Sequence, residues 1–228
     1  MNMRQATDFL RCKLLAACPL CALGRLVTGR KRFPPIHEMQ LAFVIPLDDA
    51  NSNQATRLQL GILQEYGRNP GLDAPPHITL KMGFGATDIA PFEIYLDQLA
   101  SDVAPFDISI KNFGCFDEGI LFLDVESNPA LESLRQRILA DLSRLHGIGA
   151  EPVEGTDFRF HVTLAHGFSK QEFARLRDSH ASREIHFKFT ARHIDLFCHT
   201  GNHWVTCKRA SLTTNKIEQP TTDGTSTL

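Results

Sequence analysis

The chain has 228 residues, of which 43% are hydrophobic, and its formal net charge is −2. This composition allows a sizeable buried core, and the near-neutral charge argues against a protein that coats nucleic acids or membranes. No apolar run reaches the roughly 18 residues needed to cross a bilayer, so we expect no membrane partner. Six scattered cysteines do not make a disulfide scaffold and favour a reducing, cytoplasmic location.

The two ends of the chain differ from its middle. Residues 1–36 hold seven basic residues and one acidic residue, which predicts a basic N-terminal extension. Within it, Cys18 and Cys21 form one CxxC pair, which supplies too few ligands for zinc, and the apolar run before Cys18 is short for a lipoprotein signal. Residues 213–228 are polar and aperiodic, so we expect a disordered tail. The predicted domain spans 37–212.

In the first half of this domain, apolar segments of strand length alternate with segments of helical periodicity. The first of the helices ends at Gly67, which suits a helix terminus. The order is strand, helix, strand, helix, strand, and the predicted segments are 39–47, 51–67, 75–84, 91–103 and 106–116.

The second half repeats this order and adds strands. The predicted segments are 119–127, 128–147, 158–168, 170–181, 184–198 and 203–212, of which 128–147 and 170–181 are helices. The repeated plan predicts an α+β fold with two pseudo-symmetric lobes, at about 39–116 and 119–212. We expect each lobe to be a small, mainly antiparallel sheet with outer helices, and the two lobes to surround a central cleft.

Two predicted strands carry the same histidine–threonine pattern. They read PPHITL, with His77 and Thr79, and FHVTL, with His161 and Thr163. Residues i and i+2 of a strand share a face, so each motif presents an imidazole and a hydroxyl in front of apolar side chains. One such motif is a weak signal. Composition predicts two of them by chance in roughly one sequence in a hundred, so the pair is a strong signal.

These residues resemble the signature of the 2H phosphoesterase superfamily, in particular its branch of 2′-5′ RNA ligases and RNA 2′,3′-cyclic phosphodiesterases. The resemblance rests on HITL, HVTL, their separation and the duplicated plan, and it covers about 37–212. Phe160 stands where the branch often has a proline. The resemblance implies hydrolysis of a 2′,3′-cyclic phosphate or a 2′-5′ linkage, with RNA ends or small nucleotides as substrates. It leaves reverse 2′-5′ ligation open.

The residues themselves suit this chemistry. Two histidines with an ordinary pKa of about 6.5 can act as general base and general acid without a metal or cofactor, so His77 and His161 are the predicted catalytic pair. Thr79 and Thr163 are predicted to donate hydrogen bonds to phosphate oxygens. The sequence does not decide which histidine is the base. His166 alternates away from His161, so we expect it on the opposite face of its strand.

Four further residues are weaker candidates for contact with the substrate. Lys81 and Arg159 share the faces of the two motifs by alternation and could add positive charge, although solvated cations are common at strand ends. Phe84 and Phe168 follow the two histidines at the same spacing, and either could stack on a base. For both phenylalanines, core packing is the alternative.

Two other functions compete with hydrolysis. The first is a non-catalytic module that binds a nucleotide or an RNA end, for which two matched acid–base groups have no obvious use. The second is a metalloenzyme with His77 and His161 as ligands, which is disfavoured because no carboxylate is expected on the motif faces. We expect a monomer with no metal and no cofactor.

Overall fold

The computed structural model describes residues 37–116, 119–155 and 157–213. The predictions for the basic extension, with its CxxC pair, and for residues 214–228 of the tail lie outside the described residues. No helix in the described ranges is both long and apolar enough to cross a membrane.

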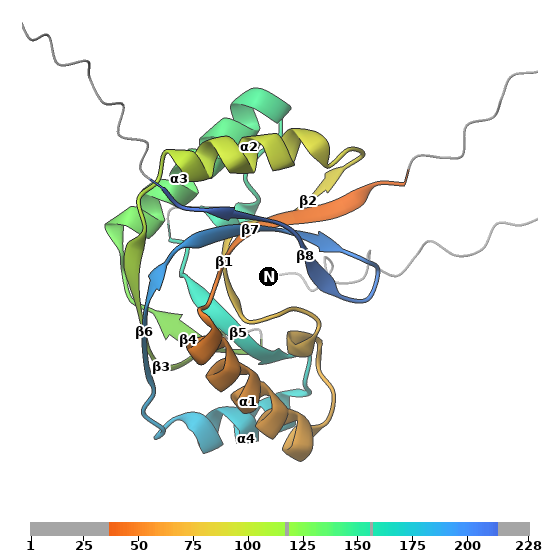
Figure 1. Ribbon diagram of the computed structural model, residues 1–228. Coiled ribbons are helices and arrows are strands. Elements are labelled where there is room, and N and C mark those ends of the chain that lie inside the picture. The colour runs from red at the N-terminus through yellow and green to blue at the C-terminus, as the bar shows by residue number, and fades with distance from the viewer. Residues whose placement is uncertain (1–36, 117–118, 156, 214–228) are drawn as a thin grey trace, which may run out of the picture. The chain divides into compact units, whose positions relative to one another are not determined.

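The first sheet is antiparallel and has the strand order β2-β1-β7-β8. Helices α2 (Ala90–Ser101) and α3 (Pro129–His146) cover its outer face (Figure 1). On that face, the ring of Phe43 lies edge-on to Tyr95 of α2, with centroids 5.8 Å apart. The strands are β1 (Met39–Pro46), β2 (His77–Ala86), β7 (His193–His199) and β8 (Trp204–Ser211).

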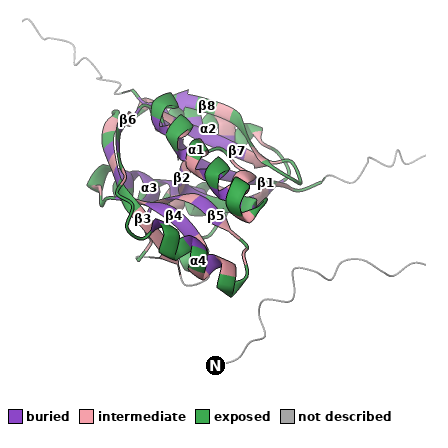
Figure 2. Cartoon of the chain, turned by 90° about the horizontal axis from the view of Figure 1, so that it is seen from below, coloured by how far each residue is buried: buried purple, intermediate pink, exposed green. Residues whose placement is uncertain are grey.

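The second sheet is also antiparallel and has the order β5-β4-β3-β6. Helices α1 (Asp49–Tyr66) and α4 (Lys170–His180) lie on its outer side (Figure 1). Buried residues follow the strands, and the exposed ones follow the outward sides of the helices (Figure 2). The strands are β3 (Phe106–Phe116), β4 (Ile120–Val125), β5 (His161–His166) and β6 (His186–Ala191).

Short-range signals fix the helix ends. The side chain of Asp48 accepts a hydrogen bond from the Asn51 amide at 2.8 Å and caps α1. Asn128 caps α3 in the same way, and this helix ends at Gly147, whose φ of 68° lies in the left-handed region that glycine tolerates. These caps explain why the observed helices match the predicted ones to within two residues.

The α+β class, the two small antiparallel sheets and the outer helices are confirmed. The sheets, however, do not divide the chain at 39–116 and 119–212. Strand β3 pairs antiparallel with β4, the next strand along the chain, and so it lies in the second sheet. The predicted strand 184–198 is two strands, β6 and β7, which separate at Arg192 and join different sheets. The helices are exchanged as well, since α1 packs on β5 and α3 packs on β2.

Candidate active site between the two histidine strands

Strand β2 departs from simple alternation just after its histidine–threonine pair. Thr79 lies opposite Val44 of β1. The next pair joins Lys81 to Phe43, so Leu80 is an extra residue on β2 and the strand has a bulge. His77 and Thr79 therefore keep the face turned away from α2 and α3, whereas Lys81 turns to the helix side with Leu80. The prediction that Lys81 shares the histidine face is wrong.

Strand β5 contains the corresponding bulge. Its pairing with β4 shifts between Thr163 and Ala165, which makes Leu164 the extra residue. Because the shift reverses the alternation beyond this point, His166 returns to the face that carries His161. The prediction that these two histidines lie on opposite faces is wrong for the same reason. Both strands thus present the motif and then bend at the same position.

The imidazole of His77 is held by a backbone carbonyl two residues before it in the chain. Its Nδ1 lies 2.7 Å from the carbonyl oxygen of Pro75, and the ring stands edge-to-face on Phe197 of β7 with centroids 5.0 Å apart. A carbonyl oxygen only accepts, so Nδ1 carries the proton in the neutral ring. This contact leaves Nε2, with its lone pair, for another partner.

The imidazole of His161 is held in the same way. Its Nδ1 donates to the carbonyl oxygen of Arg159 at 2.7 Å, and Phe116 stands edge-to-face on the ring at 5.0 Å. Phe122 of β4 packs on the same ring at 5.1 Å. The two histidines, from different sheets, therefore share one tautomer, one kind of backbone anchor and one kind of aromatic support.

Strands β2 and β5 contact each other, and burial is the main influence on the pKa values of their two histidines. Burial lowers the pKa of His77 below its ordinary value of 6.5, the Pro75 carbonyl opposes this, and the charge of His161 lowers the pKa further. Burial also lowers the pKa of His161, against the effect of its bond to the Arg159 carbonyl. Both rings are therefore mainly neutral at pH 7 in the free protein.

A buried carboxylate lies near His77. Asp195 of β7 is fully buried and accepts hydrogen bonds from Nε and NH2 of Arg209, both at 2.8 Å, and from Thr206 at 3.2 Å. Its negative charge raises the pKa of His77, as the smallest of the effects on that ring. The sequence does offer a signal for Asp195, because it is a lone acid in the otherwise apolar run HIDLF.

A second carboxylate lies directly opposite His161. Asp124 of β4 pairs with His161 in the strand register and accepts two hydrogen bonds from Arg159, at 2.8 and 2.5 Å. The guanidinium of Arg159 also lies over Phe122, 5.1 Å from the ring centroid. Arg159 therefore stays beside the motif, as expected, but with its charge partly satisfied. The expectation that no carboxylate lies near the motifs is wrong, because other strands supply Asp124 and Asp195.

The phenylalanines that follow the motifs pack against other rings. Phe84 is 7% exposed and lies in the core, stacked on Phe43 at 6.0 Å and against Phe92 at 5.1 Å. Phe168 is half-buried and meets Tyr66 edge-to-face at 6.0 Å. The core alternative therefore holds for Phe84, which has no free face for a base.

The described residues contain no group of three or more histidine, cysteine, aspartate or glutamate side chains arranged to hold a metal ion. The donor set around each motif is instead one imidazole, one threonine and an aspartate already bound to an arginine. The chemistry that this set supplies without help is proton transfer by the imidazoles and hydrogen bonding by the hydroxyls.

Comparison with known proteins assigns the family. The model of the 2′-5′ RNA ligase superfamily matches residues 47–203, which is more than half of the chain. The chain belongs to the 2′-5′ RNA ligase superfamily. A Bacillus pumilus (strain SAFR-032) protein named as a phosphoesterase is 30% identical to this superfamily member over 118 residues, 49% of this chain. The match spans 63% of that relative's length, which is less than two thirds of it.

Solved structures share the fold of this superfamily member. TT0787 of Thermus thermophilus superposes with a TM-score of 0.58 at 21% identity, over 78% of this chain and 100% of its own. Escherichia coli LigT in complex with 3′-AMP superposes with a TM-score of 0.55 at 16% identity, over 78% of this chain and 99% of its own. At these identities the likeness concerns the fold.

Proposed function

We propose that this chain is a metal-independent phosphodiesterase that hydrolyses a 2′,3′-cyclic phosphate or a 2′-5′ linkage in RNA or nucleotides. His77 and His161 act as general base and general acid. The observation that supports this most directly is the matched anchoring of the two rings, each through Nδ1 to a carbonyl oxygen at 2.7 Å. Because each Nδ1 is engaged in this way, both rings keep Nε2 for proton transfer.

The reaction needs opposite protonation states of the two rings. One neutral Nε2 takes a proton from water as the water oxygen forms its bond to phosphorus, and the other Nε2–H gives its proton to the leaving oxygen as that bond breaks. Because both pKa values are lowered, the free protein holds both rings mainly neutral at pH 7. A bound phosphodiester anion favours protonation of one ring, and so the substrate itself helps to create the acid.

The proposed role of the two threonines is to stabilise the negative charge on the nonbridging oxygens of the phosphate. Thr79 and Thr163 are half-buried and follow the histidines on the same strand face. In this role each hydroxyl donates a hydrogen bond to a nonbridging oxygen, where negative charge collects in the transition state. Removal of one such donor from other enzymes costs about 3–4 kcal/mol.

The proposed substrate class rests on family membership and on what related proteins hold. Two LigT structures contain 3′-AMP and phosphate, and these ligands belong to that protein. A nucleoside phosphate with a reactive phosphodiester fits a site with two imidazoles, since both the attacking and the leaving oxygen need a proton-transfer partner. Reverse 2′-5′ ligation uses the same two groups with their roles exchanged.

The test is a substrate panel in excess EDTA. The purified chain is incubated with 2′,3′-cyclic nucleotides, 2′-5′ dinucleotides and 3′-5′ dinucleotides, and products are identified by chromatography and phosphorus NMR. We expect turnover of a cyclic phosphate or a 2′-5′ dimer and none of the 3′-5′ dimer, with one phosphate isomer as product. Tight binding of these ligands with no product would instead support the non-catalytic binding module.

A further inference from the structure

A fully buried ion pair joins β2, the strand of His77, to the 3₁₀ turn Pro152–Glu154. Nζ of Lys81 and Oε2 of Glu154 are 2.6 Å apart, and their side chains are 1% and 0% exposed. Two charges in such a place cost much desolvation energy, and a buried pair is often no more stable than apolar residues of similar size. Stability alone is therefore a poor explanation for it, whereas a fixed geometry is a good one.

The carboxylate of Glu154 also binds two backbone amides. Oε1 accepts from the amide of Met82 at 2.7 Å, and Oε2 accepts from the amide of Glu151 at 2.8 Å. Lys81 and Met82 belong to β2, just after its bulge. Glu154 is the last residue of the 3₁₀ turn Pro152–Glu154, which precedes β5, and Glu151 is the residue before this turn. One side chain thus joins the edge strand of the first sheet to the segment that leads into the second.

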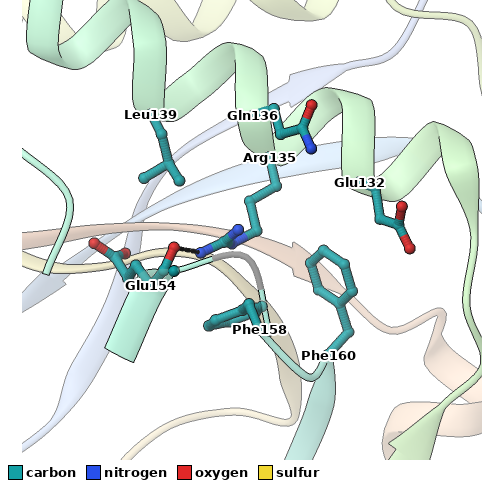
Figure 3. A pocket seen from close by; sticks show the side chains of 8 residues that line it. Glu132, Arg135, Gln136, Leu139, Glu154, Phe158 and Phe160 are labelled. Carbon is teal, nitrogen blue, oxygen red and sulfur yellow. Dashed lines mark hydrogen bonds between the residues drawn. The ribbon is translucent and has the colours of Figure 1, made fainter. Parts of the chain in front are cut away.

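Helix α3 holds the same turn from the other side (Figure 3). NH2 of Arg135 donates to the carbonyl oxygen of Glu154, and its guanidinium carbon lies 3.9 Å from the ring centroid of Phe158. A cavity of about 360 Å³, lined by Arg135, Glu154, Phe158 and Phe160 among others, lies next to these contacts.

From this geometry we propose that Glu154 is a positioning residue that sets the spacing between the strands of His77 and His161. We name the contacts of Lys81, Met82 and Arg135 with Glu154 the Glu154 clasp. These contacts involve Lys81 and Met82 of β2, which follow His77, and the turn at Glu154, which precedes His161. The β2 bulge serves this arrangement, because it turns Lys81 toward Glu154 and leaves His77 facing the other way.

The position of the His161 ring depends on the segment that the clasp holds. Its Nδ1 is anchored to the Arg159 carbonyl, and the neighbouring carbonyl of Phe160 accepts from the Val125 amide at 3.3 Å. Arg135 links the turn to the residues just before His161, because it contacts both the Glu154 carbonyl and the ring of Phe158. In other enzymes a misplacement of about 1 Å costs on the order of a hundredfold in rate. This inference rests on the proposed function of the two histidines.

The test removes both buried charges together. Lys81→Met/Glu154→Gln keeps side-chain volume and leaves no unpaired buried charge, so we expect a folded protein. Its unfolding midpoint should be somewhat lower than that of the wild type, because the Gln amide nitrogen cannot accept from one of the two backbone amides that Glu154 binds. With a 2′,3′-cyclic nucleotide, kcat should fall by roughly ten- to a hundredfold while KM changes by less than about threefold. The matched control is Lys111→Met/Glu126→Gln, which removes an exposed pair of the same 2.6 Å length and should leave kcat unchanged.

A second variant keeps the charge and alters only the reach. Glu154→Asp is shorter by one methylene and keeps both buried charges, so the free energy of unfolding should fall as the ion pair is stretched. The folded variant should lower kcat in the same direction with KM little changed. In both variants, NMR titration gives the pKa of His77 with and without the substitution His161→Gln. The difference between the two pKa values measures the electrostatic interaction of the two rings. The wild type should show His77 titrating higher when His161 is replaced, and the variants should show a smaller difference.

The outcomes separate two failures. Wild-type kcat in Glu154→Asp, or in a folded Lys81→Met/Glu154→Gln protein, would overturn the positioning role while leaving the proposed function intact. Wild-type kcat in His77→Ala would overturn the proposed function itself. A fall in kcat for both clasp variants, together with the weakened coupling between His77 and His161, supports the clasp.

Discussion

The charge of His161 lowers the pKa of His77, although the two residues belong to different sheets. The strands that carry them, β2 and β5, are each at the edge of their own sheet and lie against each other. Because His77 and His161 are the proposed base and acid, the pH dependence of activity reports on both rings.

The first prediction concerns the pH dependence of kcat/KM, which reflects the pKa values of the free protein. Activity needs one neutral and one protonated ring, and burial lowers both pKa values below 6.5. The optimum of kcat/KM should therefore lie on the acid side of 6.5, with a decline toward higher pH as the acid loses its proton. Initial rates at low substrate concentration, measured from pH 4 to pH 9, give kcat/KM at each pH. Above the higher pKa, kcat/KM should fall by about tenfold per pH unit. An optimum above pH 7.5 would contradict it.

The second prediction concerns the threonines. Thr79→Ala and Thr163→Ala should each lower kcat by about a hundredfold or more, because one donor to the developing charge is lost. The free energy of unfolding should change little, since both hydroxyls lie on half-buried faces. Thr190→Ala, which removes a hydroxyl that donates to Asp107 on β3, is the control and should keep wild-type kcat. Full activity in both motif variants would remove the threonines from the site.

The third prediction concerns Arg159, whose side chain is 48% exposed and bound to Asp124. Arg159→Ala should change the free energy of unfolding by less than about 1 kcal/mol, because the pair is open to solvent. It should raise KM for an anionic substrate by roughly threefold to tenfold, and this difference should shrink at high salt as the charge is screened. A KM that is unchanged at low salt would exclude contact with the substrate.

The fourth prediction concerns stability and pH. Burial lowers the pKa of His77, His161, His166 and His180 in the folded state. The unfolded chain therefore binds more protons below pH 6.5, so the free energy of unfolding should fall as the pH drops through this window and level off above it. Urea unfolding from pH 7.5 to 4.5 measures the slope. The slope should be smaller in His77→Gln/His161→Gln, and an equal slope there would show that other groups cause the loss.

The fifth prediction separates Phe84 from the site. Phe84→Ala should lower the free energy of unfolding by about 3–5 kcal/mol, as expected for a ring removed from a core. Phe84→Leu should cost less and keep KM at the wild-type value, because Phe84 lies on the helix side of β2. A higher KM in Phe84→Leu without loss of stability would place Phe84 near the substrate instead.

Local patterns in the sequence are enough to predict the helices, the two motifs and most of the strands, but not the division of 184–198 into β6 and β7. Helical periodicity and caps such as Asn128 act over a few residues, so they can be read directly. The assignment of strands to sheets could not be read in this way. The repeated order favours a division between 116 and 119, whereas β3 and β4, on either side of this point, pair with each other in one sheet.

The bulges explain the errors at the site. Strict alternation through Leu80 predicts Lys81 on the same strand face as His77. Strict alternation through Leu164 predicts His166 on the face opposite to His161. Each bulge adds one residue and reverses both assignments. The supporting residues, such as Phe197 and Asp195, come from strands far along the chain, and only the sheet pairing brings them to the histidines.

The most direct test of the account compares wild type with His77→Ala and His161→Ala on a cyclic nucleotide in excess EDTA. The far-ultraviolet circular dichroism and the unfolding midpoint of each variant establish that it is folded. The account predicts that the wild type turns over and that each folded variant loses at least about a hundredfold in kcat. Retention of wild-type kcat by either folded variant would contradict it.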